Sequence, residues 1–113
     1  MSTHIVTSHG ADFFGEDRYP FRTLASLAGY AEGVLPAAER GQLVQLLRDA
    51  ETGEDRFVPA AEAGTLAQQF RRIARHKFVK SRAAAQAAAL LADAAGRAAA
   101  DGEPWKWHTE ATA

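Results

Sequence analysis

The sequence contains no cysteine among its 113 residues. This absence excludes a disulfide framework, thiolate zinc sites, iron–sulfur clusters and catalysis by a thiol. The chain also lacks any run of about 18 consecutive apolar residues, and residues 1–20 combine neither a basic start nor an apolar stretch. We therefore expect a soluble cytoplasmic protein with no membrane partner, and nothing in the sequence calls for a cofactor.

Large apolar side chains are scarce as well. The hydrophobic fraction is 47%, but 26 of these residues are alanine, which leaves 27 larger side chains to build a core. That number suits one compact core and is too small for two independent ones. We therefore expect a single domain that spans residues 1–113.

Four segments have the apolar spacing of amphipathic helices. They cover approximately residues 20–34, 37–50, 59–77 and 81–101. Ser81 is the expected N-cap of the fourth helix, and Gly102 stands at its C-terminal end. Because alanine has the highest helix propensity and a small side chain, this alanine-rich helix should form easily and pack closely against a neighbour.

Three short segments, residues 4–8, 56–58 and 105–108, have the pattern of β-strands, and residues 10–20 are expected to form a loop. A lone strand leaves its backbone hydrogen bonds unmade, so the three should pair with one another. The predicted fold is α+β and mainly helical, with about four helices and a minimal two- or three-stranded sheet that joins the N- and C-termini through the C-terminal arm, residues 104–113. Trp105 and Trp107 should cover one face of this sheet. An all-helical fold with extended arms is the alternative.

Charge is distributed unevenly although the net charge is −1. No acid occurs between Ala63 and Ala92, and a helical wheel places the cations of the third helix opposite its apolar stripe. The start of the fourth helix adds further cations beside free backbone N–H groups, which favour an anion. The candidate anion-binding residues, hereafter the basic strip, are Arg71, Arg72, Arg75, His76, Lys80 and Arg82.

Two interpretations of the basic strip remain open. It could bind nucleic acid or another polyanion, and the two helices joined by a short turn loosely resemble a helix-turn-helix. Alternatively, the strip is neutralised by the chain's own acids, such as Glu39 and Asp49.

The loop that follows the first strand combines a histidine with carboxylates and aromatics. Its candidate ligand-binding residues are His9, Asp12, Phe13, Phe14, Glu16 and Asp17. Imidazole and carboxylate groups can perform acid–base chemistry or hold a metal ion, but the spacing matches neither an EF-hand nor the His-Glu-x-x-His motif. We therefore assign no catalytic residue and no metal ligand. If the first strand pairs with the C-terminal arm, His4 or His9 could approach His108.

The run from Ser8 to Asp17, SHGADFFGED, occurs together with Trp105-x-Trp107 in a chain rich in alanine and arginine. This combination is similar to small uncharacterised actinobacterial proteins of streptomycete-like bacteria. The resemblance implies no activity and transfers no functional residue.

Motifs for nucleotide binding and for serine catalysis are missing, while one face carries concentrated charge. The leading hypothesis is therefore a non-enzymatic binding or interaction protein, with a protein partner or self-association as the expected mode. Polyanion binding through residues 71–82 is one alternative. A metal- or small-molecule-dependent enzyme that uses residues 9–17 is the other.

Overall fold

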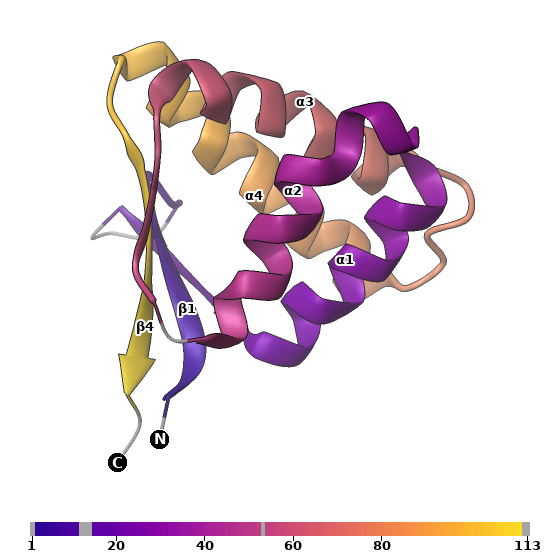
Figure 1. Ribbon diagram of the computed structural model, residues 1–113, viewed down its shortest axis with the longest axis horizontal. Coiled ribbons are helices and arrows are strands. Elements are labelled where there is room, and N and C mark those ends of the chain that lie inside the picture. Colours follow the sequence, from indigo (N-terminus) through magenta and orange to yellow (C-terminus); the bar gives the residue numbers. More distant parts are fainter. Residues whose placement is uncertain (1, 12–14, 53, 112–113) are drawn as a thin grey trace.

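The computed structural model describes residues 2–11, 15–52 and 54–111, and Figure 1 shows a β-sheet with helices packed on one of its faces. The predicted α+β class is confirmed. In chain order the described elements are β1 (Ser2–Ser8), β2 (Glu16–Pro20), α1 (Phe21–Val34), α2 (Ala37–Asp49), the short 3-10 helix η1 (Ala50–Thr52), β3 (Arg56–Val58), α3 (Ala60–Arg75), α4 (Arg82–Asp101) and β4 (Trp105–Ala111). None of the described helices is both long enough and apolar enough to cross a membrane.

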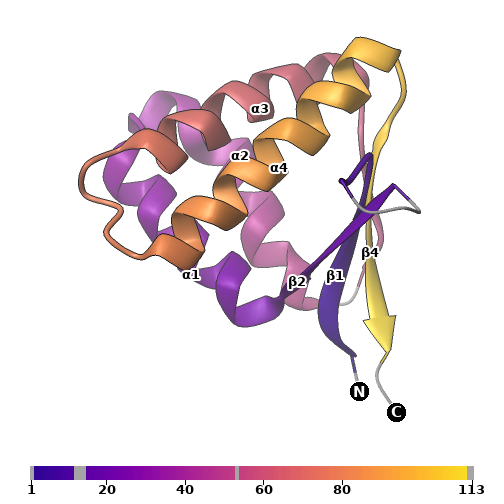
Figure 2. The same cartoon turned by 180° about the vertical axis from the view of Figure 1, so that it is seen from behind.

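The strands form one antiparallel sheet in the order β2-β1-β4-β3. Its central pair is β1 with β4, so the sheet joins the two ends of the chain, as predicted (Figure 2). Successive side chains along a strand point to opposite faces. Ile5, Thr7, Trp105 and Trp107 therefore point toward the helices and are buried, whereas Lys106 lies on the outer face and is exposed.

The sheet has four strands, and the prediction of two or three was wrong because residues 16–20 are a strand, not a loop. In β2 the inward positions are Asp17 and Tyr19, which lie opposite Thr7 and Ile5 of β1. An acid at one inward position hides the alternation of polar and apolar residues by which strands are recognised. The charged residues of β2 suit an edge strand, since charge discourages pairing with another chain.

The four helices occupy the predicted segments with small differences at their ends. Pro20, Pro36 and Pro59 each precede a helix with extended backbone, and a proline at this position prevents the helix from continuing backward. Ser81 caps α4 by accepting a hydrogen bond from the Ala84 N–H, and Gly102 ends it in the left-handed conformation, φ 68°. Both predicted caps are confirmed. Helix α3 ends at Arg75, two residues earlier than predicted.

The core lies between the sheet and the helices, and the two tryptophans lie at its centre. Trp105 is fully buried and Trp107 is 1% exposed, and their rings meet edge to face with centroids 5.2 Å apart. Phe70 of α3 packs on Trp105 in the same geometry at 6.1 Å. The prediction that both tryptophans cover one face of the sheet is confirmed.

Candidate functional site

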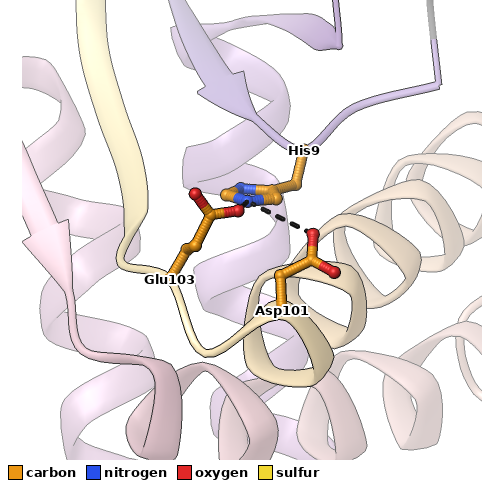
Figure 3. Close-up of side chains that lie close together, drawn as sticks. All are labelled: His9, Asp101 and Glu103. Carbon is orange, nitrogen blue, oxygen red and sulfur yellow. Dashed lines mark hydrogen bonds and ion pairs between the residues drawn. The ribbon is translucent and has the colours of Figure 1, made fainter.

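Three side chains that can bind a metal ion converge where β1, α4 and β4 meet. Figure 3 shows His9, just after β1, pointing toward Asp101 at the end of α4 and Glu103 before β4. The His9 Nε2 atom lies 3.3 Å from a Glu103 oxygen and 3.9 Å from an Asp101 oxygen. Within the described ranges this is the one group of three His, Asp or Glu residues whose ligand atoms lie within 4.8 Å of one another. We call it the His9 cluster.

Neighbouring residues fix the position of the His9 ring. Its backbone has φ 59°, which is uncommon for a residue with a side chain, and the Arg97 Nε–H donates a hydrogen bond to the His9 carbonyl at 2.7 Å. The Ser8 hydroxyl lies 2.9 Å from His9 Nδ1 and accepts a hydrogen bond from the Lys106 N–H at 2.9 Å. Trp105 Nε1–H donates to the Ser8 carbonyl at 3.0 Å. The imidazole is therefore tied to both central strands and to α4.

The two ring nitrogens of His9 have different neighbours, and this separates their roles. Nδ1 faces the Ser8 hydroxyl, and Nε2 faces the two carboxylates. His9 is 17% exposed, whereas Asp101 and Glu103 are 57% and 61% exposed. The arrangement can hold a cation between Nε2 and the carboxylates, or it can form an ion pair when the imidazole is protonated.

The carboxylates that approach His9 are not the ones that the sequence suggested. Glu16 and Asp17 belong to β2 and point to opposite faces of the sheet, and neither is part of the His9 cluster. Asp12, Phe13 and Phe14 lie outside the described residues. Of the three predicted loop residues that the structure describes, His9, Glu16 and Asp17, His9 alone belongs to the cluster.

His4 and His9 are the two histidines predicted to approach His108, and the register excludes the approach of His9. The register pairs Thr7 with Trp107, so His9 lies beside the start of β4, before His108. His4 shares the outer face with His108, but it lies opposite Glu110. Neither His4 nor His108 belongs to a group of converging ligands in the part of the chain that the structure describes.

A second polar group lies buried between the sheet and the helices. Four of its polar atoms are shielded from solvent and make no well-formed hydrogen bond. They are one oxygen of Asp17, the hydroxyls of Thr7 and Tyr19, and Nε1 of Trp107. Burial raises the pKa of Tyr19 well above its ordinary value, and the negative charge of neighbouring Asp17 raises it further. Tyr19 therefore stays protonated at neutral pH.

The basic strip is partly neutralised by the chain's own acids. Arg72 pairs with Glu39 at 2.9 Å, and Arg71 lies 3.9 Å from Asp93. Glu39 was one of the expected partners, whereas Asp49, also expected, pairs with Arg56 instead. These contacts account for two of the six residues of the strip.

The remaining cations gather at the turn between α3 and α4. Arg75, Lys77, Lys80 and Arg82 are exposed, and they form no ion pair with any other described residue. His76 is half-buried, and its Nδ1 accepts a hydrogen bond from the Phe78 N–H. Figure 1 shows this turn at the end of the molecule away from the sheet. We call residues 75–82 the hairpin tip.

An aromatic side chain stands among these cations. Phe78 is 65% exposed, and the Lys77 ammonium lies 5.7 Å from the centre of its ring. On the adjoining surface of α3, a hollow of about 190 Å³ is lined by Gln68, Arg71, Arg72 and Arg75. The hairpin tip thus offers one apolar side chain bordered by positive charge.

The helix-turn-helix interpretation is wrong. Helices α3 and α4 run side by side in opposite directions in both views of the ribbon (Figures 1 and 2), whereas a helix-turn-helix joins helices at about 90–120°. Small residues permit this close packing, since a Cβ added to Gly64 of α3 would lie 3.6 Å from the Ala99 Cβ of α4. The fourth helix packs along the third and does not project as a recognition helix.

Comparison with the curated proteins and comparison with the solved structures each gave no match. The family model described as Domain of unknown function (DUF7739) matches residues 10–108. The matched range includes Trp105, Trp107, the hairpin tip and both carboxylates of the His9 cluster. Because this match covers most of the sequence, the chain belongs to the DUF7739 family.

Proposed function

We propose that the chain is a non-enzymatic interaction protein that binds an acidic segment of a protein partner through the hairpin tip. The observation that carries this proposal is the exposure of Phe78 among four cations that have no ion-pair partner in the described ranges. Aromatic residues and arginine are enriched at the centres of protein interfaces, where they contribute much of the binding energy.

The chemistry of the hairpin tip suits an acidic peptide that also carries an apolar side chain. The Arg75 guanidinium beside the 190 Å³ hollow can bind a carboxylate through two parallel hydrogen bonds. Phe78 offers an apolar surface next to it, and Lys77, Lys80 and Arg82 extend the positive field around the ring. A partner with alternating acidic and apolar residues would complement both features.

Nucleic acid complements this surface less well. Affinity for a polyanion rises with the number of phosphates that cations neutralise, and Arg71 and Arg72 already have acidic partners within the chain. The antiparallel packing of α3 and α4 also leaves no recognition helix to enter a groove. Protein binding is therefore the function that we propose, and polyanion binding is an outcome of the test.

The test measures binding by fluorescence anisotropy in low salt. The probes are a short labelled peptide of aspartate and glutamate with one central leucine, and a single-stranded DNA of similar length. We expect the peptide to bind and Phe78→Ala to weaken binding about tenfold, because a central aromatic contributes on the order of 1–2 kcal/mol. The double variant Lys77→Glu with Lys80→Glu should abolish binding.

Two matched controls use the other end of the molecule. Phe57→Ala removes an aromatic that is 64% exposed on β3, and Lys106→Glu reverses an exposed charge on β4. Both should leave peptide binding unchanged. Loss of binding in the controls equal to that in the Phe78 variant would disprove the assignment to the hairpin tip. Tighter binding of the DNA than of the peptide would replace a protein partner with a polyanion.

A further inference from the structure

We propose that His9, Asp101 and Glu103 form a binding site for a divalent transition-metal ion, with Zn²⁺ as the best fit. Zinc takes imidazole nitrogen and carboxylate oxygen at about 2.0–2.1 Å in tetrahedral geometry, which places neighbouring ligand atoms about 3.4 Å apart. The His9 Nε2 to Glu103 distance of 3.3 Å already matches this value. The Asp101 oxygen, at 3.9 Å, needs a small rotation of an exposed side chain.

The surroundings of His9 favour a metal ligand. A ligating histidine usually donates its second ring N–H to an acceptor, which fixes the ring and the tautomer. The Ser8 hydroxyl lies 2.9 Å from Nδ1 and can accept this hydrogen bond, which leaves the Nε2 lone pair directed toward the carboxylates. The Arg97 hydrogen bond to the His9 carbonyl holds the backbone in the conformation that aims the ring.

The donor set indicates which class of metal ion fits. One imidazole nitrogen favours zinc and similar transition metals over Mg²⁺ and Ca²⁺, which prefer oxygen ligands throughout. Three protein ligands leave a fourth tetrahedral position open to water. The exposure of both carboxylates gives the ion a path of entry from solvent.

This site is separate from the hairpin tip. The tip includes Arg82, the first residue of α4, whereas Asp101 is the last of its 20 residues, so about 30 Å of helix lies between them. The His9 cluster joins the connection that follows β1 to the connection between α4 and β4. A bound ion would therefore fasten the N-terminal strand to the C-terminal part of the chain and would raise the melting temperature.

The experiment titrates purified protein with ZnCl₂ by isothermal calorimetry and follows the histidine side chains by NMR. We expect one Zn²⁺ per chain, movement of the His9 ring resonances, and a rise in the melting temperature of at least about 5 °C at a hundredfold excess over Kd. The variants Asp101→Asn and Glu103→Gln keep the size of each side chain and should each weaken Zn²⁺ binding at least tenfold. Their folding without metal is checked by circular dichroism.

Matched controls are His108→Gln and Glu62→Gln, which alter a histidine and a carboxylate outside the cluster. Both should bind Zn²⁺ like the unaltered protein. The proposal is overturned if Zn²⁺ does not bind, if the cluster variants bind as tightly as the unaltered protein, or if His108→Gln abolishes binding. In the first case the contacts of His9 with Asp101 and Glu103 are structural and hold no metal ion.

Discussion

At the scale of single residues, the inner face of the sheet combines apolar packing with buried polar atoms. The hydroxyls of Thr7 and Tyr19 and one oxygen of Asp17 are buried without a well-formed hydrogen bond. A buried polar group without a partner costs about 1–3 kcal/mol. These atoms therefore reduce the stability that Trp105 and Trp107 contribute through their burial.

Tyr19 allows a test of this arrangement by pH. Folding raises the pKa of Tyr19, so the unfolded chain loses this proton first when the pH rises above 10. Below pH 10 the Tyr19 proton is bound in both states, so the contribution of Tyr19 to the free energy of unfolding is fully present. Above pH 10 this free energy decreases by about 1.4 kcal/mol per pH unit. We expect Tyr19→Phe to remove this alkaline loss and to leave stability at neutral pH unchanged or about 1 kcal/mol higher.

Urea unfolding of both proteins at neutral pH and at several values above pH 10 measures this difference. Tyr30→Phe, which removes a half-buried tyrosine hydroxyl elsewhere, is the control and should keep the alkaline loss. Equal alkaline slopes for the Tyr19 variant and the unaltered protein would show that Tyr19 is not the group responsible.

At the scale of elements, the sequence predicts the helices well and the sheet in part. Each helix carries its own signal, an apolar stripe bounded by a proline or by the caps Ser81 and Gly102. Strand β2 carries no such signal, because Asp17 and Tyr19 share its inward face and only the partner β1 makes the segment extended. Strand identity here depends on pairing, which a local pattern does not contain.

Two glycines offer opposite outcomes for the same substitution. A Cβ at Gly64 of α3 would lie 3.6 Å from the Ala99 Cβ, an ordinary contact, so Gly64→Ala should stabilise the protein by about 0.5–1 kcal/mol through helix propensity. A Cβ at Gly10 would lie 2.5 Å from the Asp17 backbone nitrogen, so Gly10→Ala should destabilise it by about 1–3 kcal/mol. Urea unfolding measures both changes. Destabilisation by Gly64→Ala would contradict the described packing of α3 on α4.

At the scale of the whole molecule, sequence separation decides which parts of the candidate sites could be predicted. The hairpin tip is contiguous, so the sequence predicts three of its four cations, Arg75, Lys80 and Arg82, although it does not predict Lys77 as part of the site or the ion pair of Arg71 with Asp93. The His9 cluster joins residues more than 90 positions apart. The predicted pairing of the first strand with the C-terminal arm could have located it, because an antiparallel register brings the residue after β1 beside the residues before β4.

The two sites lie at opposite ends of α4. The hairpin tip, away from the sheet, is the surface that we propose for a partner. The His9 cluster, beside the sheet, is the site that we propose for a metal ion. Because the sites are far apart, each proposal can fail without the other.

We propose that the hairpin tip is the surface that binds the partner. This binding is tested most directly by mapping backbone amide shifts in two-dimensional ¹H–¹⁵N NMR while the acidic peptide with one leucine is added in low salt. We predict that the shifts concentrate in residues 75–82 and the adjoining surface of α3, and that added salt reverses them, since exposed charges are screened. Shifts that concentrate on the outer face of the sheet, or spectra that do not change, would show that the peptide does not bind at the hairpin tip.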